Sequence, residues 1–258
     1  MSVRETMGPG DATRIAAETS TEGFDVIAIA GGDGTINEAV NGLAAGHFPI
    51  AIVPLGTANV FAHELGLPLD MQACAKLVAG GAPRDVYVGN INGRRFTMMA
   101  GVGFDAYVVN RVAPRLKRRL GKLAYVLHSV ATMIDYGFPD YELVIDGTTT
   151  RAASAIIAKG HYYGGTFTCA PDARPTDPWF YVCLFRSGGR WNALRYATGL
   201  LAGRLDRFGD VDIVRAREVR ISGGVEEPVQ ADGEIVTTLP AVATIAPEPL
   251  SVIVPDVT

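Results

Sequence analysis

Two short segments of this sequence combine residue types and spacings that could do chemistry. The first is Gly31-Gly32-Asp33-Gly34-Thr35, in which three of the five residues are glycine. Glycine lets the backbone approach a ligand closely, and the N–H groups at the start of a following helix bind anions. The segment is not a Walker A loop, because no Gly-Lys-Ser/Thr follows, and it is not a GxGxxG motif. The same residues fit a tight turn in which Asp33 is a capping residue, so both interpretations stay open.

The second segment is Asp232-Gly233-Glu234, close to the carboxyl-terminal end of the sequence. A carboxylate within hydrogen-bond reach of a hydroxyl group can accept its proton during a reaction. Alternating residues of an extended segment face the same way, so Asp232 and Glu234 could act together. The alternative is an ordinary hairpin turn, which Asp-Gly favours.

Two different sequence patterns, which meet near residue 85, predict the elements that position these segments. Buried strands are expected at 24–30 and 49–54, with helices at 12–21, 35–45, 57–65 and 71–79. Strand, turn and helix in repetition are typical of a parallel α/β layer. After residue 85, Asn92-Gly93 and Asp146-Gly147 predict hairpins among short strands, with helices at 120–135 and 191–201. We expect an α/β domain over residues 1–85, a mostly antiparallel β-rich domain over residues 86–258, and a cleft between them.

Composition excludes several classes of protein. The chain has 258 residues, is 48% hydrophobic and carries a formal net charge of −4, which excludes a wholly disordered chain and a nucleic-acid-binding surface that covers the whole protein. Cys74, Cys169 and Cys183 form no CxxC pair, so we expect reduced, mostly buried thiols in a cytoplasmic protein. We expect no signal peptide, because the N-terminal residues carry charges early and contain no apolar core, and no membrane-spanning helix, because no apolar run reaches ~18 residues.

The motifs together resemble the catalytic domain of the diacylglycerol kinase and sphingosine kinase family, in its soluble bacterial lipid-kinase branch. The resemblance rests on the run from Gly31 to Leu43 followed by Pro54-Leu55-Gly56-Thr57-Ala58-Asn59. Further matches occur in the family's order at Gly8–Ala12, Gly101–Ala106, Tyr162–Gly165 and Asp232–Glu234. NAD kinases share the Gly-Gly-Asp-Gly-Thr turn, but the second block is similar to the lipid kinases. Beside the family pattern the chain is short by one strand–helix unit, which includes an Asn-Pro-x-Ser-Gly loop.

The resemblance implies an ATP-dependent lipid kinase and assigns roles to residues. ATP phosphates would contact Gly31, Gly32, Asp33, Gly34, Thr35, Ile36 and Asn37, with further nucleotide contacts from Thr57 and Thr6. Thr57 is expected to begin the helix at 57–65. Glu234 would be the base that accepts the lipid hydroxyl proton, and Asp232 its partner in orientation or metal binding. Asp105 would hold a network in the cleft, although it could equally be a helix N-cap.

The resemblance also implies two magnesium sites. One Mg²⁺ would accompany the nucleotide. A second, structural Mg²⁺ would lie at Asp177, with Arg174 and Trp179 offering only backbone carbonyls. Here the sequence departs from the family's Asp-Gly-x-Leu-Asp pattern, because Pro178 replaces glycine and Tyr181 replaces the later acid. Lys159 stands where the family usually carries asparagine. It could contact phosphate, or it could be an exposed residue at the end of a strand.

A cluster of basic residues suggests how a lipid kinase could reach its substrate. Such clusters attract anionic membrane surfaces, so we expect peripheral docking at the inner membrane face, although a solvated helix or loop explains the same charges. The cluster comprises Arg111, Arg115, Lys117, Arg118, Arg119 and Lys122. No nucleic-acid partner is expected, and a homodimer is compatible with the sequence. Two alternatives to lipid kinase activity stay open: an inactive nucleotide- or lipid-binding member of the fold, and a kinase with another acceptor such as NAD.

Overall fold

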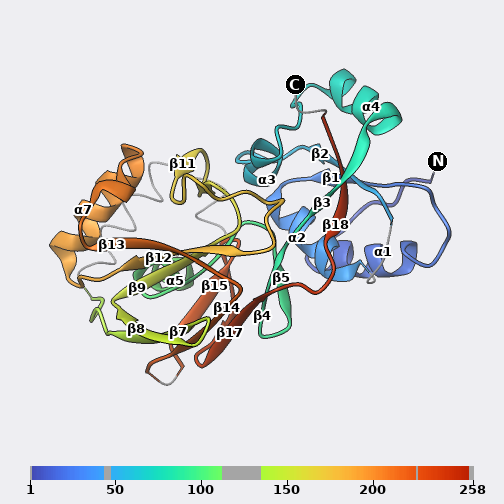
Figure 1. Cartoon of the computed structure of the whole chain (residues 1–258). Helices are drawn as coiled ribbons and strands as arrows, with labels where there is room; N and C mark the ends of the chain where they lie inside the picture. The colour runs from blue at the N-terminus through green and yellow to red at the C-terminus, as the bar shows by residue number, and fades with distance from the viewer. Residues whose placement is uncertain (1, 44–47, 112–134, 225, 256–258) are drawn as a thin grey trace.

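The first sheet joins the beginning and the end of the described chain. In the computed structural model, which describes residues 2–43, 48–111, 135–224 and 226–255, this sheet has the strand order β1-β2-β18-β3. The bounds are β1 (Ile27–Gly31), β2 (Ile50–Pro54), β18 (Leu250–Val254) and β3 (Ala82–Val86). Strands β1, β2 and β18 are parallel, and β3 runs antiparallel to β18 (Figure 1). The expected α/β domain is confirmed, with one antiparallel strand at the edge of its sheet.

Four helices belong to this domain and position its loops. They are α1 (Asp11–Thr19), α2 (Asp33–Gly42), α3 (Val60–Glu64) and α4 (Met71–Gly80). Helices α1 and α2 pack so closely that a Cβ on Gly42 would lie 1.9 Å from the carbonyl oxygen of Thr13. The Thr13 hydroxyl donates to the carbonyl oxygen of Glu38 at 2.9 Å. Helix α1 therefore holds α2 in place directly after β1.

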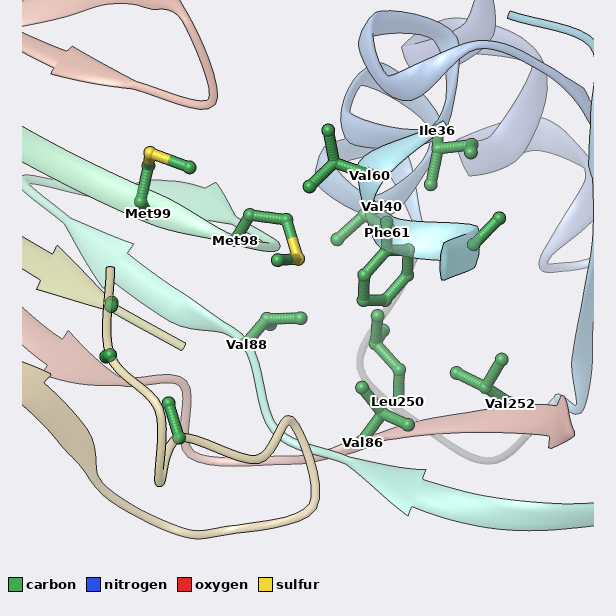
Figure 2. Packing of buried hydrophobic residues seen from close by; sticks show 14 of the residues in the cluster. Ile36, Val40, Val60, Phe61, Val86, Val88, Met98, Met99, Leu250 and Val252 are labelled. Atoms are coloured by element: carbon green, nitrogen blue, oxygen red, sulfur yellow. The ribbon is translucent and has the colours of Figure 1, made fainter. Parts of the chain in front are cut away.

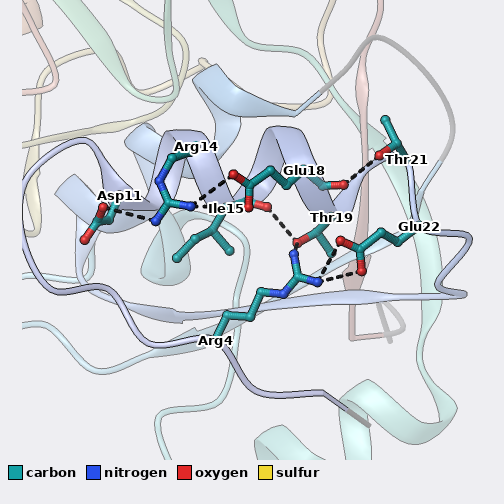
Figure 3. A network of polar contacts seen from close by, with 8 residues as sticks. All are labelled: Arg4, Asp11, Arg14, Ile15, Glu18, Thr19, Thr21 and Glu22. Atoms are coloured by element: carbon teal, nitrogen blue, oxygen red, sulfur yellow. Dashed lines mark hydrogen bonds and ion pairs between the residues drawn. The ribbon is translucent and has the colours of Figure 1, made fainter.

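Polar contacts fix the segment before α1 (Figure 3). The guanidinium of Arg4 donates to both carboxylate oxygens of Glu22, at 2.7 and 2.6 Å, and to the Thr19 hydroxyl at 3.1 Å. The Asp11 carboxylate accepts the backbone N–H groups of Met7 and Gly8, at 2.8 and 3.1 Å. The segment that carries Thr6 is thus bonded at both ends to α1 and the turn after it.

The second domain consists of two antiparallel sheets of six strands each, with orders β13-β12-β9-β6-β15-β16 and β5-β4-β17-β14-β7-β8. The first sheet contains β13 (Val211–Ala216), β12 (Phe180–Phe185), β9 (Ser154–Ala158), β6 (Met99–Val102), β15 (Pro228–Ala231) and β16 (Glu234–Thr238). The second contains β5 (Arg94–Phe96), β4 (Gly89–Ile91), β17 (Ala241–Ile245), β14 (Glu218–Ser222), β7 (Tyr141–Ile145) and β8 (Thr148–Ala152). The remaining elements are α5 (Phe104–Arg111), the hairpin β10 (Tyr162–Tyr163) and β11 (Phe167–Thr168), α7 (Arg190–Leu201) and the 3₁₀ helix η1 (Leu205–Arg207).

The hairpins follow from turn chemistry. Asn92-Gly93 and Asp146-Gly147 both adopt positive φ, at 47° and 90° and at 45° and 85°. Positive φ at both central residues is the geometry of a type I′ turn, whose twist matches that of the flanking strands. Both predicted hairpins are confirmed, joining β4 to β5 and β7 to β8.

Two hydrophobic cores hold the molecule together. One fills the space between the two sheets of the second domain, where the rings of Phe96 and Phe180 stack with centroids 5.8 Å apart. The other contains residues of both domains, and Figure 2 shows Met98 of the second domain pointing toward Val40 and Phe61 of the first. Because one core spans the junction, apolar packing fixes the loops of the first domain against the second.

The structure differs from the predicted division of the chain in one respect. Strand β18 lies at residues 250–254, yet it pairs with β2 and β3 of the first sheet. A single boundary at residue 85 therefore does not describe the arrangement, because the chain crosses to the second domain and returns. The predicted helix at 120–135 lies almost wholly outside the described residues. Among the described residues, no helix is long and apolar enough to cross a membrane.

Candidate nucleotide and acceptor site

The loops after β1 and β2 lie backbone against backbone. The ladder between the strands continues into the loops, because the Leu55 N–H donates to the carbonyl oxygen of Gly31 at 2.9 Å. A Cβ on Gly56 would lie only 2.6 Å from the Cα of Gly32, and one on Gly32 only 3.1 Å from the Cα of Gly56. A side chain at either position would separate the loops. Gly32 and Gly56 are thus required for this close approach.

The Gly31–Thr35 segment opens helix α2, as predicted. Gly32 is the extended N-cap residue, and Asp33 is the first residue of the helix. The first N–H groups of a helix have no partner within it and carry a partial positive charge. A Cβ on Gly34 would meet no atom within 4 Å, so the space beside these groups is open to a ligand. The arrangement can hold a phosphate.

Asp33 has a role that neither sequence interpretation anticipated in detail. Its carboxylate accepts the backbone N–H of Phe61 at 3.1 Å, in the first turn of α3. Asp33 therefore joins the two loops instead of capping its own helix. Ile36 is fully buried in the core, so only its backbone is available to a ligand.

The second loop is fixed by Asn59. This residue has φ of 46°, and its side-chain amide binds Gly56 twice, accepting from N at 2.8 Å and donating to O at 2.9 Å. The expectation that Thr57 begins a helix is wrong, because α3 begins only at Val60. The left-handed Asn59 bends the backbone out of the helical path. Thr57 is instead an exposed residue of the loop, and Thr6 is also exposed.

Asp232 is the most heavily bonded acid of the site. Its Oδ2 accepts from Asn37 Nδ2 at 2.7 Å, from Thr97 N at 2.6 Å and from Thr97 Oγ1 at 2.9 Å. Its Oδ1 accepts from the N–H groups of Met98 and Met99, at 2.9 and 3.0 Å. Five donors occupy the carboxylate, and one of them comes from α2 of the other domain. This saturation does not suit a metal ligand, whose lone pairs must face the ion.

Glu234 contrasts with Asp232 although only Gly233 separates them. Asp232 and Gly233 have φ of 47° and 83°, so the segment is the hairpin turn between β15 and β16. The sequence predicts that Asp232 and Glu234 face the same way in an extended segment. This expectation is wrong, because the backbone turns between them. The Asp232 carboxylate is used by surrounding donors, whereas Glu234 is exposed. Glu234 is free to meet a substrate.

Asp105 connects to this turn through one residue. It is 9% exposed, and its Oδ2 accepts from Gln230 Nε2 at 2.7 Å. Gln230 Oε1 in turn accepts the N–H of Gly233 at 2.9 Å. The Tyr163 hydroxyl donates to Asp105 Oδ1. Asp105 thus lies in a polar network between α5, the β10–β11 hairpin and the acidic turn, and its functional role stays a prediction.

The predicted structural metal site does not fit a metal ion. The ammonium of Lys159 donates to the carbonyl oxygens of Asp177, Trp179 and Arg174, at 2.5, 3.2 and 3.5 Å. These are the three residues named as metal ligands, and their carbonyls already face a cation. Lys159 is 1% exposed, so the expectation of a solvated strand end is wrong. Burial lowers the pKa of Lys159 to about 8, while the charges of Asp177 and Glu64 act in the opposite direction.

Two residues that make polar contacts in this region were not predicted from the sequence. Glu64, at the end of α3, accepts the N–H groups of His161 and Tyr162 at 2.9 and 3.3 Å, and it also bonds the imidazole Nδ1 of His161. No local signal marked it, because its partners are almost a hundred residues away. Gln230 had a signal, since it is a polar residue in a strand whose neighbours Val229 and Ala231 are apolar and buried.

The remaining predictions concern charge and metals. Of the basic cluster, Arg111 ends α5 with its guanidinium 4.9 Å from the ring centre of Tyr107, and the other five members lie outside the described residues. The three cysteines are free and buried, as expected. Across the part of the chain that the structure describes, no three His, Cys, Asp or Glu side chains are grouped as a metal site would need.

Comparison with known proteins identifies similar chains over nearly the whole length. Residues 1–91 match the diacylglycerol kinase catalytic domain, and residues 98–254 match the YegS C-terminal NAD kinase beta sandwich-like domain. A diacylglycerol kinase of Bacillus subtilis is 33% identical over 246 residues, which cover 93% of this chain and 80% of that protein. One from Mycobacterium tuberculosis H37Rv is 30% identical and covers 95% of this chain and 82% of that protein. The crystal structure of a diacylglycerol kinase from Bacillus anthracis superposes with a TM-score of 0.77 at 26% identity, covering 97% of this chain and 84% of that one.

Proposed function

We propose that this chain uses ATP to phosphorylate the hydroxyl of diacylglycerol or a related lipid. The chain belongs to the diacylglycerol kinase catalytic-domain family, and it is a phosphotransferase with an alcohol group as acceptor. The phosphates of ATP would bind at the N-terminus of α2 and at the loop that carries Thr57. The lipid hydroxyl would approach from the side of Glu234.

One observation carries this proposal: the hydrogen bond of 2.7 Å between Asn37 and Asp232. Asn37 lies one turn into α2, whose first residues form the phosphate site. Asp232 begins the turn that presents Glu234. The bond therefore holds an exposed carboxylate at a fixed place relative to the phosphate site, which is the arrangement that phosphoryl transfer needs.

The proposed reaction needs one proton acceptor. The Glu234 carboxylate accepts the hydroxyl proton as the lipid oxygen forms a bond to the γ-phosphorus of ATP. The bond between the γ-phosphorus and the bridging oxygen breaks, and ADP leaves with that oxygen. Bound with the nucleotide, Mg²⁺ would neutralise phosphate charge. The N–H groups at the start of α2 would add to this stabilisation in the space beside Gly34.

Asp232 has a different role in this proposal. Because five donors occupy its two oxygens, it neither takes the proton nor holds a metal. It is a positioning residue that fixes the turn before Glu234 against α2 and β6. Of the two roles expected for it, orientation and metal binding, the contacts favour orientation.

The test is a phosphorylation assay on the full chain. With ATP, Mg²⁺ and diacylglycerol in detergent micelles, we expect phosphatidic acid as the product. Glu234→Gln removes the proton acceptor and should lower kcat by about 100- to 10,000-fold. Because Glu234 is exposed, the Glu234→Gln variant should have the same melting temperature as the wild type. A parallel assay with NAD in place of lipid tests the other acceptor.

Glu248→Gln provides the matched control, because Glu248 is another exposed glutamate, in the loop between β17 and β18. Its turnover should equal that of the wild type. Absence of any phosphorylated lipid from the wild type, phosphorylation of NAD alone, or equal turnover by Glu234→Gln would overturn the proposal.

A further inference from the structure

Three backbone carbonyls converge on one buried lysine. Lys159 is the first residue after β9, and its ammonium donates to the carbonyl oxygens of Asp177, Trp179 and Arg174. An ammonium has three N–H donors and no acceptor, so three carbonyls satisfy it completely. The carbonyls also need the ammonium, because oxygen dipoles that point at one another repel unless a positive group lies between them.

The same carbonyls cannot hold Mg²⁺ at the same time. Mg²⁺ requires near-octahedral oxygen ligands at about 2.0–2.1 Å, and it would displace the ammonium from the carbonyls. The displaced ammonium would then be buried beside a second positive charge. Two sequence changes agree with the loss of the metal, because Pro178 and Tyr181 stand where the family pattern has glycine and an acid. Tyr181 is buried, and it cannot supply the missing carboxylate.

We propose that Lys159 is a built-in replacement for a structural metal ion, and that this site takes no divalent cation. The ammonium holds the loop at 174–179 against the end of β9, as an ion coordinated by the loop carbonyls would. This inference does not depend on the kinase activity, because it concerns the folded chain before any substrate binds.

The loop that Lys159 holds also lies against the connection between the domains. The Tyr87 N–H, between β3 and β4, donates to Pro175 O at 2.8 Å, and the Tyr87 ring centre lies 6.0 Å from the ammonium. Two residues after Lys159, His161 bonds Glu64 of the first domain. The lysine therefore stabilises the junction of the two domains, and it does so at any magnesium concentration.

The test compares thermal unfolding in EDTA with unfolding in millimolar MgCl₂, without nucleotide. The wild type should melt at the same temperature in both. Lys159→Met keeps the length of the side chain but removes the charge, and it should lower the melting temperature by roughly 5–10 °C in both buffers. Lys159→Asn opens space at the carbonyls, so it should melt low in EDTA and recover stability in MgCl₂. Lys76→Met, at an exposed position on α4, is the control and should melt like the wild type.

A second readout uses Trp179, which lies at the site. Terbium bound at these carbonyls would be excited through the indole and would luminesce. We expect terbium luminescence from Lys159→Asn and none from the wild type. The proposal is overturned if MgCl₂ raises the melting temperature of the wild type, if the wild type gives the terbium signal, or if Lys159→Met is as stable as Lys76→Met. The wild-type measurements decide the matter even where a variant fails to fold.

Discussion

Two hairpin turns of this protein have the same dipeptide and almost the same backbone, but their surroundings differ. Asp146-Gly147 joins β7 to β8 with φ of 45° and 85°, and Asp232-Gly233 joins β15 to β16 with φ of 47° and 83°. The exposed Asp146 accepts N–H groups of Arg217 and Glu218 at 2.9–3.1 Å, all within its own domain. Asp232 accepts five donors, including Asn37 of the other domain.

The comparison separates what the dipeptide determines from what the fold determines. Asp-Gly sets the turn in both places, because both residues tolerate positive φ. The partners of the carboxylate decide whether the turn is only local or whether it joins two domains. Only the second kind can hold a side chain of one domain, here the proposed base Glu234, at a fixed place relative to the proposed phosphate site of the other.

The largest effect is expected from Asp232→Ala. Removing the carboxylate leaves five donors without this acceptor and should lower the free energy of unfolding by on the order of 3 kcal/mol. The turn would lose its link to α2, so kcat should also fall by about 100-fold or more. Thermal unfolding and the micelle assay measure the two losses. An unchanged melting temperature would contradict the structural role that we assign to Asp232.

A smaller effect is expected from Asn37→Ala, which removes the one donor to Asp232 that comes from the first domain, together with the bond of 3.2 Å from Asn37 Nδ2 to the carbonyl oxygen of Arg95. Asp232 keeps four of its five bonds, so the turn should keep its shape, and the free energy of unfolding should fall by about 1–2 kcal/mol. We expect kcat to fall by about 10-fold, because Glu234 is no longer fixed to α2.

Asn41→Ala is the matched control for Asn37→Ala. Asn41 lies one turn further along α2 and bonds the backbone of Arg95, at 3.0 Å to O and 2.8 Å from N. It also donates to Asn37 Oδ1 at 3.2 Å, but it has no hydrogen bond to Asp232. Its loss should lower stability by a similar amount but kcat much less. Equal losses of kcat in both variants would mean that the α2–β5 contact as a whole matters, and not the bond to Asp232.

The smallest effect is expected from Asp146→Ala. This change removes acceptors for two backbone N–H groups at an exposed turn, which should cost about 1 kcal/mol of unfolding free energy. The turn does not touch the first domain, so kcat should match the wild type in the micelle assay. A loss of activity comparable to that of Asp232→Ala would show that the two turns do not differ in the way proposed here.

Much of this arrangement could be predicted from the sequence, because it depends on local patterns. Apolar runs predicted β1 and β2, glycine placed the loop before α2, and Asx-Gly pairs predicted the hairpins. The expected burial of the first strand is wrong, because β1 is an edge strand in which only Ile29 is buried. The exceptions depend on distant partners. No spacing indicates that Asp33 binds Phe61, that Lys159 binds the carbonyls at 174–179, or that Glu64 binds His161. The sequence predicts a helix from Thr57, but Asn59 adopts a φ of 46° and delays the start of α3 to Val60.

Strand β18 has a consequence for how this chain acquires its structure during synthesis. In the first sheet it lies between β2 and β3, so until residues 250–254 have been made β3 has no partner strand and β2 pairs only with β1. By then the whole intervening second domain has been synthesised. The loops after β1 and β2, which we propose bind the nucleotide, are therefore made early, but the sheet that carries them is completed late. A ribosome that stops between residues 246 and 249 releases a chain with all the strands of the second domain, in which β3 is not joined to β1 and β2.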